Sequence, residues 1–318
     1  MSLSPTRRTL LASAGLMAAP TLLRADDPKP QKSTFGFCLN TSTIRDNGKP
    51  RPLAELIDVT KKAGYGAIEP WILELDEFRK KEKLSDAKKR IDDAGLVVPD
   101  AIGFAEWIVD DPARRKKGLE QAKRDMDLVQ QIGGKRLAAP PVGATGGTSQ
   151  RDDPKNSQNV LDLVAAADRY RALLELGKTM GVTPIVELWG FSKNVSRLGQ
   201  AVLIASESGT AGGGVLPDVY HLYKGGSDFN GLKLLAGHAV GIFHVNDYPQ
   251  IDRTKIVDAD RVYPGDGIAP LKEIFATLRQ IGFNGFLSLE LFNRDYWKQD
   301  PLVVARTGYE KMKAAAGV

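Results

Sequence analysis

Residues 183–188 read Thr-Pro-Ile-Val-Glu-Leu, and residues 214–219 read Gly-Val-Leu-Pro-Asp-Val, with an amphipathic stretch at 194–208 between them. Both short runs are apolar on both faces, which is typical of strands buried in a parallel sheet. Parallel strands are joined by crossover helices, so this stretch predicts one strand–helix–strand unit of an α/β protein.

The same alternation continues in both directions along the chain. Pro52 begins a predicted helix that Gly64 ends, which is the usual asymmetry of helix termini. No Gly-x-Gly-x-x-Gly motif follows the first apolar run, which argues against a dinucleotide-binding sheet. Eight units therefore predict a closed (β/α)8 TIM barrel as a single domain over residues 34–318. The other predicted strands lie at 35–39, 66–69, 96–102, 136–139, 240–245 and 286–290.

The N-terminus has the pattern of an export signal. Residues 6–11 read Thr-Arg-Arg-Thr-Leu-Leu, and an apolar stretch continues to Leu23. This stretch is shorter than the roughly 20 apolar residues that a membrane span needs. Paired arginines before a mild apolar segment predict a twin-arginine-like signal at 1–25 and a linker at 26–33, hence a periplasmic protein. A plain secretory signal or a retained anchor is the alternative, and the protein is cytoplasmic if the signal is not used.

Composition excludes several classes of protein. Apolar residues make up 42% and charged residues 26% of the 318 residues, as in ordinary globular proteins. Three arginines and no acidic residue lie in 1–25, so the formal charge of +5 falls to +2 without this segment, which is poor support for a nucleic-acid surface. The single cysteine allows no intramolecular disulfide, and with three histidines any metal site must rely on carboxylates.

Ionisable residues stand at the ends of four consecutive predicted strands: Glu187, Asp218, His244 and Glu290. Barrel enzymes build their sites at this end of the strands. Taken alone, each residue has a structural explanation as a rim ion pair or a hydrogen-bonded core group. Converging in one barrel mouth, they would lose hydration and repel unless a cation compensated them. Three carboxylates and one imidazole predict one divalent metal ion, Mn²⁺ or Mg²⁺ first, with Co²⁺ and Zn²⁺ also compatible.

Aromatic and acidic residues follow other strand ends. All four tryptophans lie just past predicted strands, where their rings suit the C–H faces of a sugar or pack as lids over the rim. Glu69 and Glu106 are placed to bind substrate hydroxyls or to pair with Lys and Arg. The tryptophans are Trp71, Trp107, Trp189 and Trp297.

The chain resembles the xylose-isomerase-like TIM-barrel superfamily over about residues 34–315. Members include sugar phosphate isomerases and epimerases, ketose 3-epimerases, inosose dehydratases and hydroxypyruvate isomerases. The motifs that carry the resemblance are Leu39-Asn40-Thr41-Ser42-Thr43, Val186-Glu187, Pro217-Asp218 with His221, Phe243-His244-Val245-Asn246-Asp247, Pro264-Gly265-Asp266-Gly267 and Leu289-Glu290.

The resemblance implies roles for individual residues. Glu187, Asp218, His244 and Glu290 would bind one Mn²⁺ or related ion, and the two glutamates would also move protons on opposite faces of a substrate carbon. His221 would stabilise the developing oxyanion, and Arg253 or Arg261 would hold a substrate hydroxyl or phosphate. The further substrate-binding candidates are Asn40, Glu69, Trp71, Trp107, Trp189 and Asp247.

The resemblance implies a metal-dependent isomerase or epimerase that acts on a sugar-like hydroxyketone through an enediolate. Ketose 3-epimerases carry an Asn-Arg pair and a further acid soon after the first glutamate, whereas residues 188–193 read Leu-Trp-Gly-Phe-Ser-Lys. A lyase or dehydratase acting on a keto-sugar or keto-glycoside at the same site is therefore the alternative, and a non-catalytic carbohydrate-binding protein is a further one. A DNA-repair enzyme with three zinc ions would need more histidines than the chain has.

The expected partner is a small carbohydrate, with no nucleic acid and no membrane-spanning segment in the mature chain. The family resemblance allows a homodimer or a homotetramer.

Overall fold

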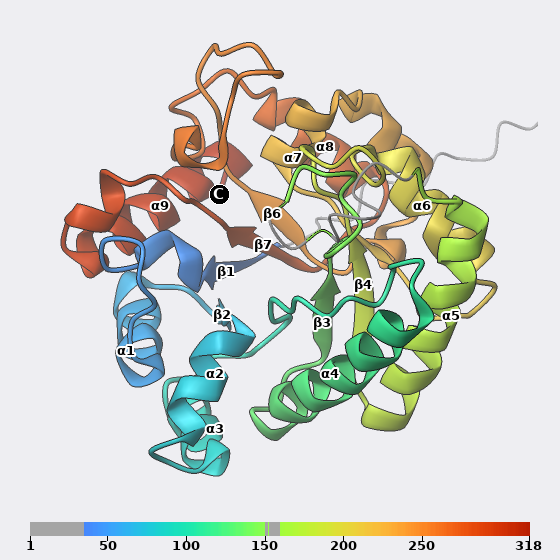
Figure 1. Ribbon diagram of the computed structural model, residues 1–318. Coiled ribbons are helices and arrows are strands. Elements are labelled where there is room, and N and C mark those ends of the chain that lie inside the picture. The colour runs from blue at the N-terminus through green and yellow to red at the C-terminus, as the bar shows by residue number, and fades with distance from the viewer. Residues whose placement is uncertain (1–34, 150–151, 153–159) are drawn as a thin grey trace, which may run out of the picture.

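The computed structural model describes residues 35–149, 152 and 160–318. The predicted export signal and linker lie outside this part of the chain. Strands occupy the centre and helices surround them (Figure 1). The strands of the described residues are β1 (Gly36–Asn40), β2 (Ala67–Glu69), β3 (Arg136–Ala139), β4 (Thr183–Glu187), β5 (Val215–Leu216), β6 (Phe243–Val245) and β7 (Phe286–Leu289).

All strand pairs are parallel, in two sheets with the orders β2-β1-β7-β6 and β3-β4-β5. Single bridges join the sheets: Val215–Val240 and Asp218–His244 on one side, Ala67–Val97 and Ile102–Ala138 on the other. The barrel is therefore closed, as predicted.

The predicted strand at 96–102 is wrong in detail. This segment lies between β2 and β3 and completes the barrel, but only isolated bridges join it to its neighbours. Pro99 lies in its middle and has no N–H to donate, which interrupts a regular ladder.

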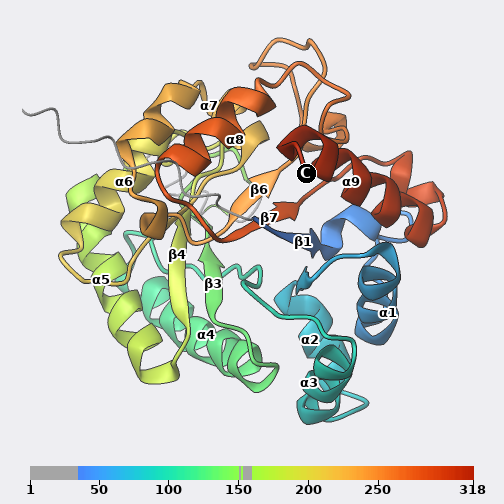
Figure 2. The same ribbon diagram turned by 180° about the vertical axis from the view of Figure 1, so that it is seen from behind.

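Helices alternate with the strands along the chain, as the sequence predicts. Two helices were not predicted, α2 and α7. Asp111 caps α4 by accepting hydrogen bonds from the amides of Ala113 and Arg114, and Asp300 caps α9 in the same way. Figure 2 shows α9 beside α1, where the ring of helices closes. The α-helices are α1 (Leu53–Ala63), α2 (Ile72–Arg79), α3 (Leu84–Asp93), α4 (Pro112–Gln131), α5 (Leu163–Met180), α6 (Leu198–Glu207), α7 (Val219–Gly225), α8 (Leu271–Gln280) and α9 (Pro301–Ala316).

Five short 3-10 helices occur in the described residues: Thr41–Ile44, Phe229–Leu234, Gly237–Ala239, Asp258–Asp260 and Tyr296–Lys298. Within this part of the chain, no helix is both long and apolar enough to cross a membrane.

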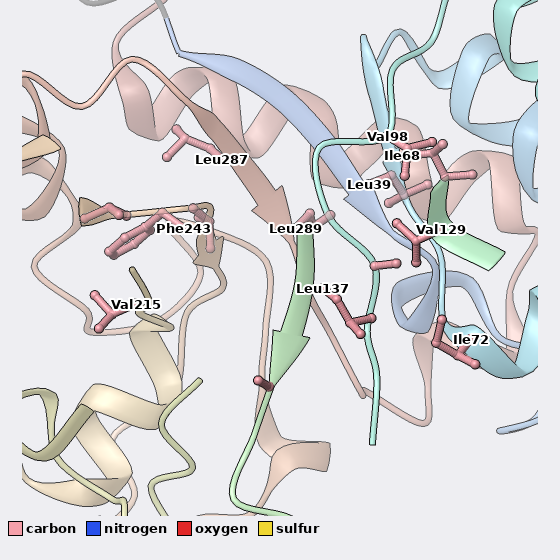
Figure 3. Close-up of a cluster of buried hydrophobic side chains, with 14 of the residues drawn as sticks. Leu39, Ile68, Ile72, Val98, Val129, Leu137, Val215, Phe243, Leu287 and Leu289 are labelled. Carbon is pink, nitrogen blue, oxygen red and sulfur yellow. The ribbon is translucent and has the colours of Figure 1, made fainter. Parts of the chain in front are cut away.

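The main hydrophobic core lies between the strands and the helices, and includes Leu39, Ile68, Leu137, Phe243 and Leu289 (Figure 3). A smaller apolar cluster is formed by Ile102, Ala138, Ile185, Leu216 and Ile242. Side chains alternate along an extended strand, so Leu287 and Leu289 of β7 join the main core. Ser288, and Glu290 directly after the strand, join the polar network of the site. This alternation brings acidic side chains into an otherwise apolar centre.

Candidate active site

Three of the four predicted metal ligands come together at the carboxyl ends of the strands. Glu187 is the last residue of β4, His244 lies in β6, and Glu290 follows β7 directly. One ligand atom from each of these three buried residues lies within 4.8 Å of the others. The structure therefore groups side chains from strands that are far apart in the sequence.

Asp218, the fourth predicted ligand, lies beside this group but has hydrogen-bond partners on both oxygens. Its Oδ1 accepts from the His221 amide at 2.7 Å, as the N-cap of α7. Its Oδ2 accepts from Asn246 Nδ2 at 2.8 Å and from Arg261 at 2.9 Å, and lies 3.8 Å from His244 Nδ1. Asp218 is thus close enough to join the group only if these contacts are rearranged.

Two buried atoms of the group have no hydrogen-bond partner, namely Glu187 Oε2 and His244 Nδ1. Burial and the charge of nearby Glu290 raise the pKa of Glu187 well above its usual value. Burial opposes charge on His244, but the carboxylates of Glu69 and Glu290 raise its pKa well above its usual value. A divalent cation would satisfy both orphaned atoms and offset the clustered negative charge, so the residues fit such an ion.

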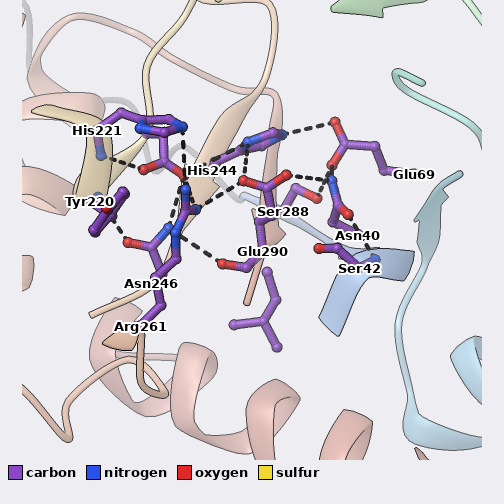
Figure 4. Close-up of polar contacts among 12 residues, drawn as sticks. Asn40, Ser42, Glu69, Tyr220, His221, His244, Asn246, Arg261, Ser288 and Glu290 are labelled. Atoms are coloured by element: carbon purple, nitrogen blue, oxygen red, sulfur yellow. Dashed lines mark hydrogen bonds and ion pairs between the residues drawn. The ribbon is translucent and has the colours of Figure 1, made fainter. Parts of the chain in front are cut away.

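Arg261 fills the space between two carboxylates of the site. Its Nη1 donates to Asp218 Oδ2 and Glu290 Oε2, each at 2.9 Å, and its Nη2 donates to Asp258 Oδ1 at 2.7 Å. The guanidinium lies 4.3 Å from the centre of the Tyr220 ring. Figure 4 shows Arg261 among Glu290, His221 and Asn246, and its side chain is fully buried.

Arg253, the other arginine considered for substrate binding, is exposed and lies against Gly226. It does not line the cavity, whereas Arg261 does. The backbone explains the difference, because Val262 pairs with Asp247 just after β6 and so returns Arg261 to the strand ends.

A cavity of about 190 Å³ lies at the group, and its lining combines polar and apolar side chains. Trp71 and Trp189 line it, as predicted for aromatic residues beyond strand ends. The polar lining residues are Glu187, His221, Asp258, Arg261 and Glu290, and the apolar ones are Trp71, Ile102, Phe104, Trp189, Phe191 and Phe292.

His221 is neutral in this cavity, because burial lowers its pKa to about 3. Its Nδ1 lies 3.2 Å from the Gly190 amide and its Nε2 lies 3.2 Å from Arg261 Nη2. A neutral imidazole has one acceptor nitrogen, so only one of these contacts is a hydrogen bond at a time. The other nitrogen carries the proton that a substrate oxygen can receive as a hydrogen bond.

Four sequence candidates lie outside the cavity lining. Trp107 is buried, donates to the Pro140 carbonyl and packs against Tyr170. Trp297 donates to the Ser42 carbonyl, and Glu106 pairs with Arg114. Asp247 accepts hydrogen bonds from four backbone amides, those of Tyr248, Gly265, Gly267 and Ala269. These contacts give all four residues structural roles that compete with substrate binding.

Asn40 and Glu69 are buried and also lie outside the cavity lining. Asn40 Nδ2 donates to Glu69 at 2.8 Å and to Glu290 at 3.2 Å, and its Oδ1 accepts from Trp71 Nε1. Both residues therefore support the side chains that face the cavity.

The sequence analysis missed three aromatic lining residues and Asp258. Alternation past a strand end is a usable signal for two of them, because Phe104 follows Ile102 by two positions and Phe292 follows Glu290 by two. Phe191 lies in a turn and Asp258 begins a three-residue 3-10 helix, and neither is long enough to give a periodic signal.

The buried carboxyl group of Glu74 makes the stability of the fold depend on pH, and Glu74 is not one of the candidate metal ligands. Its Oε2 accepts from Thr41 Oγ1 and from the Trp71 amide, yet burial raises its pKa to about 7. The folded state thus favours the protonated acid, so this contribution to stability is complete below the unfolded pKa and is lost as the pH rises through 7. We expect wild type to lose about 2–3 kcal/mol more than Glu74→Gln between pH 5 and pH 8 in urea unfolding. Parallel profiles would contradict this assignment.

The comparison with protein families agrees with this geometry. The sequence model of the xylose isomerase-like TIM barrel family matches residues 57–315. The chain therefore belongs to this family.

Individual proteins are similar to this chain over most of its length. The chain is 26% identical over 284 residues to an inosose isomerase of Bacillus velezensis, covering 87% of this chain and 96% of that protein. It is 24% identical over 249 residues to a 3-dehydroshikimate dehydratase of Pseudomonas aeruginosa, covering 76% of this chain and 36% of that protein. The crystal structure of IolI protein with a bound zinc atom has the same fold, with a TM-score of 0.79, 22% identity and coverage of 89% and 98%.

Proposed function

We propose that the protein is a divalent-metal-dependent isomerase or epimerase that acts on an uncharged, sugar-like hydroxyketone. The observation that carries the proposal is the convergence of Glu187, His244 and Glu290, with two buried atoms unsatisfied, at a cavity that Glu187 and Glu290 line. The inosose isomerase relative supports the same class of reaction.

The chemistry that a divalent ion supplies at Glu187, His244 and Glu290 is stabilisation of negative charge on a substrate oxygen. The chain's own groups move the protons. Glu187 and Glu290 reach the cavity from β4 and β7, which are not neighbours in the barrel, so one carboxylate removes the proton next to the carbonyl and the other returns one. Neutral His221 and Arg261 donate hydrogen bonds to the oxygen that gains charge.

The lining residues favour an uncharged substrate. The single lining arginine, Arg261, already contacts Asp218, Asp258 and Glu290, which leaves little positive charge for a phosphate. The other lining residues include aromatic and aliphatic side chains, which suit the C–H faces of a ring. A cyclic polyol ketone meets both conditions.

The carboxylate-rich donor set favours Mn²⁺ or Mg²⁺ as the native ion, with Co²⁺ and Zn²⁺ as alternatives. Most sites of this kind bind Zn²⁺ more tightly than Mn²⁺ whichever ion is native, so affinity does not identify the native ion. The rate of deuterium exchange into substrate by the protein loaded with each ion ranks them. Faster exchange with Zn²⁺ than with Mn²⁺ would contradict the preference.

A dehydratase is the second candidate, because one relative is a 3-dehydroshikimate dehydratase. The first step would be the same proton removal, followed by loss of a neighbouring hydroxyl that a carboxylic acid protonates. The two candidates differ only in the fate of that hydroxyl.

Incubation in D₂O with Mn²⁺ and a panel of inososes, ketoses and keto-glycosides tests the proposal. Deuterium at the carbon next to the carbonyl, with the skeleton intact, is the expected result by mass spectrometry. Deuterium uptake with loss of water or of an aglycone would establish the dehydratase or lyase instead. Sugar binding without exchange would identify a non-catalytic carbohydrate-binding protein.

A further inference from the structure

Behind the cavity, a second carboxylate contacts the metal-ligand candidate His244. Glu69 ends β2 and is fully buried, and its Oε1 lies 2.9 Å from His244 Nε2 (Figure 4). Its Oε2 accepts hydrogen bonds from Asn40 Nδ2 at 2.8 Å and from Ser288 Oγ at 2.6 Å. Both oxygens of Glu69 are therefore held by side chains from three other strands, β1, β6 and β7.

This contact determines which nitrogen of His244 is available to a ligand. Glu69 is an acceptor, so it requires a proton on Nε2. The other nitrogen, Nδ1, has no hydrogen-bond partner, lies 3.2 Å from Glu290 Oε2 and belongs to the group with Glu187. With the Nε2 proton held by Glu69, the lone pair available for an ion is the one on Nδ1.

We propose that Glu69 is a positioning residue that holds His244 in the tautomer and orientation needed to bind the metal ion. The inference rests on the proposed metal-dependent function and changes the role expected for Glu69, which the sequence analysis placed among the substrate-binding candidates. Carboxylates that receive the second N–H of a ligating histidine raise its basicity and fix its ring.

Asp100 extends this arrangement into the core. It is fully buried, and neither of its oxygens accepts a hydrogen bond from the described residues. Burial and the charge of Glu69 raise the pKa of Asp100 well above its usual value, which favours the protonated carboxyl. A protonated carboxyl donates to Glu69 and keeps a second negative charge out of the barrel interior.

Glu69→Gln tests the proposal, because glutamine has nearly the same shape. It removes the charge, and its amide group can donate to Nε2, which favours the tautomer that blocks Nδ1. We expect the dissociation constant for Mn²⁺, measured on the purified protein by chelator competition, to rise about 10–100-fold. Unchanged Mn²⁺ affinity, with a raised KM alone, would overturn the proposal and restore a substrate-binding role.

Asp125→Asn is the matched control, since Asp125 is a buried, hydrogen-bonded carboxylate on the outer helix α4. It should lower the melting temperature and leave the Mn²⁺ affinity within about twofold of wild type, as expected for independent sites. If Glu69→Gln does not fold, Ser288→Ala removes one hydrogen bond to Glu69 and should weaken Mn²⁺ binding by a smaller factor. No change in affinity with Ser288→Ala would then count against the proposal.

A second readout does not depend on metal. Nitrogen-15 spectra of wild type should show a His244 Nε2–H signal protected from exchange with water, and Glu69→Gln should weaken that protection. Rapid exchange of this proton in wild type would overturn the inference. Failure of wild type to bind any divalent ion would instead contradict the proposed function. The exchange rate of the His244 Nε2 proton would still test whether Glu69 holds this nitrogen protonated.

Discussion

Glu187→Gln is expected to lower kcat by about 10²–10⁴-fold while the barrel stays folded. The amide retains the volume of the side chain but cannot remove a proton. Glu187 Oε2 has no hydrogen-bond partner, so the substitution breaks no contact at that atom. Removing the charge also relieves its repulsion with Glu290, so the metal-free variant should be at least as stable as wild type. Deuterium exchange into substrate and thermal unfolding measure the two effects.

Glu106→Gln is the matched control, because Glu106 is a half-buried carboxylate that pairs with Arg114 outside the cavity lining. Its kcat should equal that of wild type. A Glu187→Gln protein that keeps more than about a tenth of wild-type kcat would remove Glu187 from proton transfer, since the expected minimum effect is about 10²-fold.

Arg261→Met is expected to lower the free energy of unfolding of the metal-free protein by about 3–5 kcal/mol. The substitution leaves Asp218 and Glu290 without the cation that they share at 2.9 Å each. Buried carboxylates that lose their partner are strongly destabilising. Urea unfolding with and without Mn²⁺ measures the effect.

Added metal should stabilise Arg261→Met more than wild type, because it replaces the missing positive charge between the same carboxylates. A free metal concentration of 100 times the dissociation constant adds about 2.7 kcal/mol to the free energy of unfolding. Arg253→Met, at an exposed position, should change stability by less than about 0.5 kcal/mol and respond to metal as wild type does. Equal metal responses of Arg261→Met and wild type would contradict the shared-charge interpretation.

The sequence predicted the barrel because its strands are apolar on both faces and its helices carry clear terminal signals. Pro52 and Gly64 mark helix ends that the structure has within one residue. It failed at 96–102, where Pro99 prevents a regular ladder although the apolar pattern is that of a strand. It also missed α7, because Pro217-Asp218 ends β5 and begins a helix within two residues.

The site could be predicted where a strand end fixes a side chain, and less well elsewhere. Glu187, His244 and Glu290 follow from that rule, since parallel strands end at one edge. The choice between Arg253 and Arg261 depended on how a long loop returns to the barrel, which no periodic pattern records. Burial likewise could not be read from the sequence for Trp107, whose indole packs inward instead of towards the cavity.

The barrel consists of two sheets that are joined at two places by single bridges only. Glu187 and Asp218 belong to the sheet of β3, β4 and β5, or follow it directly, whereas His244 and Glu290 belong to the other sheet or follow it. An ion bound by residues of both sheets would link them across the junction where Asp218 pairs with His244. Separation of β5 from β6 and loss of the ion would then be one linked equilibrium. Amide exchange along β5 and β6 should therefore be slower with the ion bound than without it, and so report metal occupancy.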